Sequence, residues 1–211
     1  MDLKQRSENM RTFFNSKAEE SYDEVHAFYM NTKEMISEKL ECGTKNILDL
    51  GGGTGLELIS VFKKFPDAKV TVIDISEKML GMLDKRDFAG KVTKICGDFF
   101  EVDFGKDYDA VISTSALHHF LKEDKLRLFE KICKCLRSGG VFINSDKFAN
   151  TPEDEAKALE DYYRYKDMLP HIDTPLTAEE ESRLLFEAGF ENIDIFDCDA
   201  EYYKLIKASK A

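Results

Sequence analysis

The sequence predicts an α/β fold built around a parallel, doubly wound sheet, and three observations support this. Short, mostly apolar segments rich in β-branched residues alternate with helical segments through much of the 211 residues, as in βαβ units. Glycines gather at residues 51–55, between the first strand segment and the helix after it. The last two strand segments are separated by only four residues, a connection that permits only antiparallel pairing.

Five strand segments carry the alternation. They are short and mostly apolar, as expected for a sheet that helices cover on both faces. They occupy residues 46–50 (NILDL), 69–73 (KVTVI), 91–95 (KVTKI), 109–113 (DAVIS) and 140–145 (GVFINS).

Three helices are predicted between these strands because apolar residues recur at helical spacing. The first occupies residues 55–65, with Leu58 and Val61 on one side, and the second follows Ser76, which is a suitable N-cap. The third occupies residues 123–136, and the glycines at 139–140 are expected to end it through a left-handed C-cap.

Two regions lie outside the alternation. At the front, residues 21–24 (SYDE) match a capping box and predict a helix to about Leu40. At the back, residues 151–153 (TPE) predict a helix to about Asp167, followed by a loop, a helix at 178–188 and strands at 192–197 and 202–208. No internal repeat or low-complexity linker interrupts the chain, so we expect one domain over residues 1–211.

Composition narrows the classes of function. The net charge of −11 argues against binding to nucleic-acid phosphates in general. The N-terminus has no apolar segment of the secretory type, and the longest apolar runs are far shorter than a membrane span. Five scattered cysteines suit reduced thiols in a cytoplasm, and the C-x-C at 133–135, without a second Cys/His pair, does not indicate a metal site.

The glycine-rich turn indicates that a ligand approaches the main chain there. Gly51, Gly53 and Gly55 differ from the dinucleotide-binding pattern G-x-G-x-x-G, because Leu56 stands in place of its third glycine. Asp74 ends the second strand, at the sheet edge where open α/β sheets bind ligands. Its carboxylate could accept hydrogen bonds from both hydroxyl groups of a ribose. An N-cap role for Asp74 is the alternative, but Ser76 is better placed for it.

A second acidic residue follows the third strand in CGDFF, residues 96–100. Gly97 permits a turn, Asp98 could accept a hydrogen bond from an adenine amino group, and Phe99 offers a ring face for stacking. Because these residues follow the strand next to that of Asp74, we expect an adenine pocket beside a ribose site.

Five motifs, in this order along the chain, resemble those of the class I S-adenosylmethionine-dependent methyltransferases. They are ILDLGGGTG, TVIDIS, CGDFF, DAVISTSALHHF and LRSGGVFI. More narrowly, they resemble small-molecule methyltransferase domains of the methyltransferase-25 and ubiquinone-biosynthesis type. The resemblance covers residues from about Phe13 to the end. It implies a Rossmann-like sheet of seven strands with the last strand antiparallel, and S-adenosylmethionine as cofactor.

The resemblance also implies roles for single residues. The glycine loop would hold the methionine part of the cofactor, with Asp49 near its ammonium group, and an N-terminal helix would cover it through Tyr22 or Tyr29. The cofactor-binding residues so implied are Asp49, Gly51, Gly53, Gly55, Asp74, Ile75, Met79, Asp98, Phe99, Ser113, Ser115, Tyr22 and Tyr29.

Three histidines and one aspartate, in two segments of the chain, are candidates for catalysis or acceptor binding. His118 and His119 follow the fourth strand, and His119 is the preferred general base, although one of the pair could cap or pack while the other is solvated. His171 and Asp173 could reach over the transferred methyl group, or form only a turn before the proline.

Two sequence features that the fourth-strand motif lacks restrict the class of methyl acceptor. The motif lacks the Asn/Asp-Pro-Pro-aromatic sequence of nucleobase and amide methylators, and it lacks the acid that metal-dependent catechol methylators use as a ligand. We therefore expect metal-free transfer to a small molecule, with no metal, nucleic-acid or membrane partner. The sequence does not indicate an oligomeric state.

The predicted domain has four parts: N-terminal lid helices (1–41), a cofactor-binding core (42–146), a substrate-cap insertion (147–177), and a closing helix with an antiparallel strand pair (178–211). Two other functions fit the same glycines and Asp74. A nicotinamide oxidoreductase is the first, although no Tyr-x-x-x-Lys arrangement is evident. A protein that binds S-adenosylmethionine without catalysis is the second.

Overall fold

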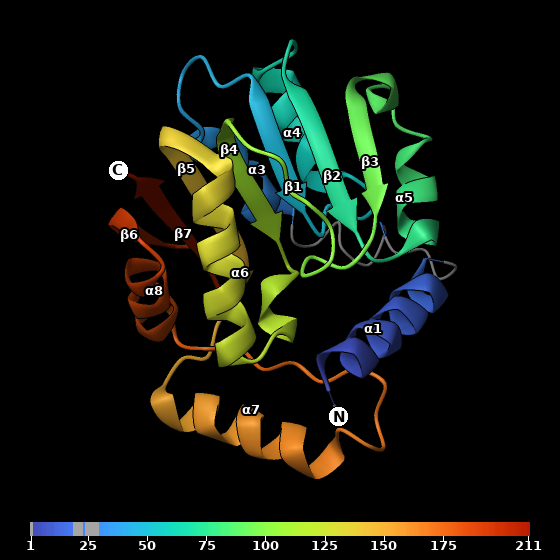
Figure 1. Cartoon of the computed structure of the whole chain (residues 1–211), viewed down its shortest axis with the longest axis vertical. Coiled ribbons are helices and arrows are strands. Elements are labelled where there is room, and N and C mark those ends of the chain that lie inside the picture. Colours follow the sequence, from blue (N-terminus) through green and yellow to red (C-terminus); the bar gives the residue numbers. More distant parts are fainter. Residues whose placement is uncertain (1, 19–22, 24–29) are drawn as a thin grey trace.

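The computed structural model describes residues 2–18, 23 and 30–211, and its centre is a mixed sheet in the order β3-β2-β1-β4-β5-β7-β6 (Figure 1). Strands β1 to β5 pair in parallel, whereas β7 runs antiparallel to both β5 and β6. This confirms the predicted α/β class with an antiparallel last strand. The strands are β1 Asn46–Leu50, β2 Lys69–Asp74, β3 Val92–Cys96, β4 Tyr108–Thr114, β5 Leu136–Lys147, β6 Phe190–Asp197 and β7 Tyr203–Lys210.

Helices cover both faces of this sheet and the carboxyl ends of its parallel strands. Figure 1 shows α6 and α8 on the near face, α3 and α4 behind the sheet, and α1 and α7 across the strand ends. The α-helices are α1 Leu3–Lys17, α3 Met30–Lys39, α4 Leu56–Lys64, α5 Glu77–Leu83, α6 Lys122–Cys135, α7 Pro152–Tyr165 and α8 Ala178–Glu187, with short 3₁₀ turns η2 Ala89–Lys91 and η3 Leu117–His119. Within these described residues, no helix is both long and apolar enough to span a membrane.

Strand alternation divides the apolar residues between two cores. Along β1, Leu48 packs with α6 and α8 residues, while its neighbour Ile47 packs with α3, α4 and α5 residues. Along β4, Val111 and Ile112 divide in the same way. Successive side chains of a strand point to opposite faces, so these fully buried strands need apolar residues at both positions.

The end of α6 departs from the sequence prediction. The helix ends at Cys135, and Leu136 is already extended, with φ −71° and ψ 144°. Gly139 does have a positive φ of 68°, but it lies within β5, where the pairing with β4 shifts register. A Cβ on Gly140 would lie 2.9 Å from the carbonyl oxygen of Arg137. These glycines therefore accommodate an irregularity in the strand instead of capping the helix.

Lid helices were predicted within residues 1–41, but the bounds of helix α1 were not. Asp2 caps it, and its carboxylate accepts a hydrogen bond from the Gln5 N–H at 2.9 Å. Asn15 Oδ1 accepts a hydrogen bond from Ser76 Oγ at 2.7 Å, and Arg6 forms an ion pair with Asp124 at the start of α6. Tertiary contacts with α5 and α6 thus place this mostly polar helix. The predicted start of the next helix at residue 21 lies outside the described residues, and α3 occupies the last part of the predicted range.

The helix of the predicted insertion begins as expected. Thr151 Oγ1 accepts a hydrogen bond from the Asp154 N–H at 3.1 Å, and Pro152 is the first helical residue of α7. The chain then returns to the sheet, since Ala149 and Thr177 form a parallel bridge. The segment between them lies at the carboxyl end of the parallel strands.

Candidate functional site

The glycine-rich turn after β1 has a left-handed backbone at three of its glycines. Gly51, Gly53 and Gly55 have φ angles of 77°, 48° and 73°. A Cβ on Gly51 would lie 2.5 Å from the Cβ of Ala116, so a larger residue cannot be accommodated there without movement. The turn is closed by a hydrogen bond from the Gly51 N–H to the Ile73 carbonyl oxygen at 2.8 Å, and Gly55 is the N-cap of α4.

Asp74 connects the end of β2 to this turn. Its Oδ2 accepts a hydrogen bond from the Gly53 N–H at 2.9 Å, and its Oδ1 accepts one from the Ser76 N–H at 2.7 Å. Ser76 itself caps α5 by accepting from the Met79 N–H at 3.1 Å, as predicted. Burial of the Asp74 carboxyl raises its pKa to about 6, although the hydrogen bonds to its charged form oppose that shift.

Asp98 and Phe99 follow β3 at the same edge. Asp98 Oδ1 accepts a hydrogen bond from the Phe100 N–H at 2.8 Å, which fixes the turn. The Phe99 ring is buried and lies edge-on to Phe104, with ring centroids 6.5 Å apart. A fixed carboxylate and a fixed aromatic ring therefore stand beside Asp74.

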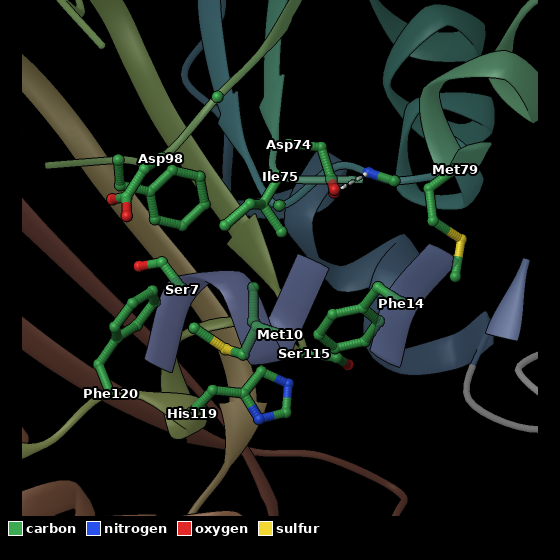
Figure 2. Close-up of a pocket in the computed structure, with 15 residues that line it drawn as sticks. Ser7, Met10, Phe14, Asp74, Ile75, Met79, Asp98, Ser115, His119 and Phe120 are labelled. Carbon is green, nitrogen blue, oxygen red and sulfur yellow. Dashed lines mark hydrogen bonds between the residues drawn. The ribbon is translucent and has the colours of Figure 1, made fainter. Parts of the chain in front are cut away.

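These residues line one pocket at the carboxyl ends of β1, β2, β3 and β4 (Figure 2). The structure brings together eight of the predicted cofactor residues and the preferred catalytic histidine in its lining, namely Gly51, Gly53, Asp74, Ile75, Met79, Asp98, Phe99, Ser115 and His119.

Helix α1 forms the opposite wall of the pocket. Ser7, Met10 and Phe14 line it, and Figure 2 shows Met10 and Phe14 facing the side on which Ile75 and Met79 lie. Sequence reasoning missed all three residues, although their spacing of three and four is that of one helix face. The lid tyrosines predicted at residues 22 and 29 lie outside the described residues.

Asp49, Gly55 and Ser113 are the predicted cofactor residues that the structure places outside the pocket lining. Asp49 is completely buried, and neither of its carboxylate oxygens has a hydrogen-bond partner among the described residues. Burial, reinforced by the nearby Glu57, raises the pKa of Asp49 well above its usual value. The hydroxyl of Ser113 donates to the Leu50 carbonyl oxygen at 2.8 Å and joins neighbouring strands.

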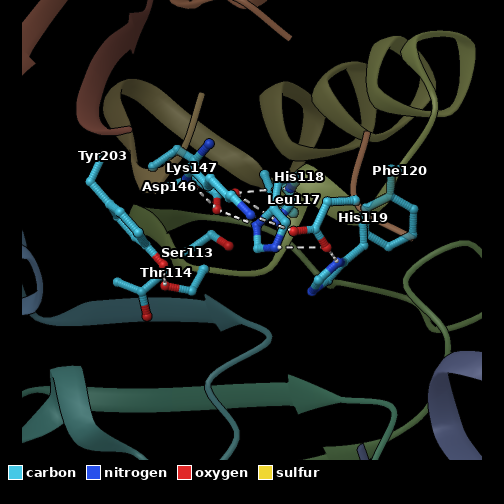
Figure 3. A network of polar contacts seen from close by, with 12 residues as sticks. Ser113, Thr114, Leu117, His118, His119, Phe120, Asp146, Lys147 and Tyr203 are labelled. Carbon is cyan, nitrogen blue, oxygen red and sulfur yellow. Dashed lines mark hydrogen bonds and ion pairs between the residues drawn. The ribbon is translucent and has the colours of Figure 1, made fainter. Parts of the chain in front are cut away.

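The turn η3 after β4 is held by a buried carboxylate that sequence reasoning did not identify. Asp146, near the end of β5, accepts hydrogen bonds from the N–H groups of Leu117 and His118 at 2.8 and 3.0 Å. Its other oxygen lies 2.6 Å from His118 Nδ1 (Figure 3). The sequence signal that could have identified Asp146 is its position near the end of β5, the strand next to β4. The pKa of Asp146 lies below its usual value despite burial, because His118 stabilises the charged form.

Asp173 meets all three histidines of the predicted site. Its Oδ1 lies 3.6 Å from His118 Nε2, 3.4 Å from His119 Nδ1 and 3.2 Å from His171 Nε2. His171 Nε2 is also 2.8 Å from His119 Nδ1. Lys147 Nζ pairs with the second oxygen of Asp173 at 2.7 Å. The two predicted pairs, 118–119 and 171–173, thus form one cluster.

The pKa values of His119, His171 and Asp173 are all lowered, so the two imidazoles favour the neutral form and the carboxyl group favours the charged form. Burial and the neighbouring His118 lower the pKa of His119 to about 3, so its imidazole is neutral at pH 7. Burial also lowers the pKa of His171. For Asp173, burial works to raise the pKa, but the histidines and Lys147 outweigh it and hold that pKa well below its usual range.

Comparison with known sequences agrees with this site. A family model described as a methyltransferase domain matches residues 47–140. A carboxy-S-adenosyl-L-methionine synthase of Nautilia profundicola is 29% identical over 166 residues, which cover 71% of this chain and 70% of that protein. A malonyl-acyl-carrier-protein O-methyltransferase of Priestia megaterium is 36% identical over 99 residues, which cover 47% of this chain and 35% of the other.

Comparison with solved structures identifies the same fold. Human N-acetylserotonin methyltransferase, solved in complex with S-adenosylmethionine, superimposes with a TM-score of 0.72 and 21% identity. The match covers 94% of this chain and 56% of the human chain, so this chain spans about half of that protein. At this identity the likeness establishes the fold alone.

Proposed function

Because this chain belongs to the class I S-adenosylmethionine-dependent methyltransferases, we propose that it transfers the cofactor's methyl group to a nucleophilic atom of a small molecule. The observation that carries the proposal is the single pocket that joins Asp74, the glycine turn and His119. Its cofactor side and its histidine side meet at the carboxyl ends of the strands, where open α/β sheets bind ligands.

The pocket residues fit S-adenosylmethionine. The ionised form of Asp74 can accept hydrogen bonds from ribose hydroxyls, and Asp98 and Phe99 offer a carboxylate and a ring for the adenine. The bare backbone at Gly51 and Gly53 leaves room for the amino-acid part, where an added side chain on Gly51 would already meet Ala116. When bound, the cofactor supplies an electrophilic methyl group on a sulfonium centre.

We propose that the acceptor contacts His119, which lines the pocket and adjoins His171. A neutral imidazole can accept a hydrogen bond from a hydroxyl or amine of the acceptor. A group with a pKa of about 3 is a poor general base near neutral pH, where catalysis favours a matched pKa. Alignment and exclusion of water, to which α1 contributes through Met10 and Phe14, therefore account for most of the acceleration.

Replacement of Asp74 tests the cofactor assignment. We expect Asp74→Ala to weaken S-adenosylhomocysteine binding by about 2–3 kcal/mol, because two charge-assisted hydrogen bonds to ribose are lost. The matched control is Asp84→Ala on the exposed end of α5, which should bind like the wild type. Isothermal titration calorimetry measures both variants, with NAD as a second ligand. Unchanged affinity in Asp74→Ala, or tighter binding of NAD than of S-adenosylhomocysteine, would contradict the assignment.

A further inference from the structure

Three side chains from two distant segments direct metal-binding atoms at one point. The Nε2 of His118, the Nδ1 of His119 and a carboxylate oxygen of Asp173 all lie within 4.8 Å of one another. They form the one such group of three or more potential ligands in the part of the chain that the structure describes. Figure 3 shows His118 and His119 side by side at the turn that carries them.

The carboxylate oxygen at the centre of this group is unusual. Asp173 Oδ1 is buried and accepts no hydrogen bond from any described residue, although three ring nitrogens lie 3.2–3.6 Å away. A buried carboxylate oxygen without a partner costs free energy, so such oxygens normally have a hydrogen bond or a cation. The ring nitrogens lie near this oxygen, but no described group donates a hydrogen bond to it.

The separations fit the coordination of a small divalent ion. With zinc-to-ligand distances near 2.0–2.1 Å, neighbouring ligands of a tetrahedral site lie about 3.3 Å apart. The three distances from Asp173 Oδ1 are 3.6, 3.4 and 3.2 Å.

Outer contacts orient the ligands in the manner of metal sites. His118 presents Nε2 to the group because its Nδ1 is paired with Asp146 at 2.6 Å, and ligating histidines characteristically pair their other nitrogen with a carboxylate. Asp173 is fixed through its second oxygen by Lys147. Two carboxylates and one lysine leave a net negative charge around the group. The side chains of Asp173 and His171 are 26% and 19% exposed, which gives an ion a path from solvent.

We propose that His118, His119 and Asp173 form a site for a divalent first-row transition ion such as Zn²⁺. Imidazole nitrogen suits zinc, iron and nickel ions, and two imidazoles with one carboxylate leave room for a further ligand. Because His119 also lines the cofactor pocket, the ion stands at the acceptor end of that pocket. With an ion on Nδ1, the His119 ring no longer has a free nitrogen there to accept a hydrogen bond from the acceptor.

This site departs from the metal-free expectation drawn from the sequence. That expectation rested on the lack of an acid at the end of the fourth strand. The carboxylate of this site comes instead from Asp173, 54 residues after His119. The proposal rests on the geometry of the cluster, and holds whether or not the acceptor is a small molecule.

Metal titration of the full chain, stripped with a chelator, tests the site. We expect one Zn²⁺ per chain by calorimetry, and Co²⁺ to give the intense visible bands of a four-coordinate site with nitrogen ligands. Asp173→Ala should weaken Zn²⁺ binding by on the order of 100-fold, and Asp146→Asn by about 10–100-fold through loss of the His118 orientation. The matched control Asp167→Asn, in the same segment but 77% exposed, should bind as the wild type does, and so should Cys133→Ser/Cys135→Ser.

Circular dichroism of each variant separates loss of the site from loss of the fold. His171→Ala is a further variant, because it removes the neighbour of His119 and leaves the Asp173–Lys147 pair in place. It should retain one Co²⁺ per chain but change the visible bands. The proposal is overturned if folded wild type binds no Zn²⁺ in the micromolar range, or if Asp173→Ala and the cysteine variant bind equally well. Binding of S-adenosylhomocysteine in the same samples reports separately on the cofactor site.

Discussion

Burial and hydrogen bonding act in opposite directions on the pKa of Asp74. Burial raises this pKa, and three hydrogen bonds to the charged form lower it. Two of these bonds come from the backbone N–H groups of Gly53 and Ser76, which also shape the glycine turn and the start of α5. Burial prevails and raises the pKa of Asp74 to about 6. A single residue thus couples the shape of the turn to a charge that changes within the accessible pH range.

This pKa predicts a pH dependence of cofactor binding. Below pH 6 the free protein holds Asp74 mainly protonated, whereas ribose hydroxyls bind better to the ionised form. Binding then releases a proton, so affinity for S-adenosylhomocysteine should rise about tenfold from pH 5 to pH 7 and level off above. Calorimetry over this range measures it. In Asp74→Asn the affinity should be lower and flat across the range, and the same slope in that variant would assign the titration to another group.

At the scale of elements, α1 is held over the pocket by polar contacts. Asn15 Oδ1 accepts from Ser76 Oγ at 2.7 Å and from the Lys78 N–H at 3.3 Å, next to the Asp74 carboxylate. A ligand in the pocket lies beneath Met10 and Phe14. Opening of α1 is therefore expected to precede release of the cofactor.

Asn15→Ala should loosen this closure. Loss of about 1 kcal/mol of hydrogen bonding corresponds to roughly fivefold faster dissociation of S-adenosylhomocysteine. Stopped-flow displacement measures the rate, and Glu8→Ala on the exposed side of α1 is the control, since Glu8 pairs only with Arg11 among the described residues. If dissociation is equally fast in Asn15→Ala and wild type, α1 is a fixed wall and not a lid.

The insertion between β5 and α8 divides into two parts with different expected mobility. Residues 171–177 are attached to the site, because the Thr174 N–H donates to the His118 carbonyl oxygen at 2.8 Å and Thr177 bridges to Ala149. Helix α7 is mostly exposed, and Tyr162 is its buried residue. The substrate-cap insertion predicted for residues 147–177 is therefore expected to move through α7 and residues 166–170.

Amide hydrogen exchange tests this division. Protection of residues 152–170 should rise when cofactor and acceptor bind together, whereas residues 171–177 should be protected with and without ligands. Equal protection of α7 in both states would make the whole insertion scaffold.

At the scale of the whole molecule, the sequence was informative where local signals and fold agree. The order of short apolar strands, the glycine turn and the Ser76 and Thr151 caps each have a local physical cause, and the structure contains them. The bounds of helix α1 within the predicted lid were missed because its sequence carries few apolar residues, and packing against α5 and α6 places it. The predicted end of α6 was wrong because a glycine with positive φ, such as Gly139, occurs in strand irregularities as well as in helix caps.

The candidate site was only partly predictable for a related reason. Residues that end strands can be assigned to one sheet edge from their order, which placed Asp74, Asp98 and His119 together. Contacts between distant segments have no such rule. Asp173 was a candidate from the sequence, but its meeting with His118 and His119 came from the fold alone, as did Asp146 and the α1 residues.

The central claim is transfer of the cofactor's methyl group to a small molecule. The most direct test incubates the protein with S-adenosylmethionine carrying an isotopically labelled methyl group and a fractionated metabolite extract. Mass spectrometry should find the label on one small molecule, formed in equal amount with S-adenosylhomocysteine, and both products should be lost in Asp74→Ala. Tight binding of S-adenosylmethionine with no labelled product and no S-adenosylhomocysteine would contradict the claim and leave a binding protein without catalysis.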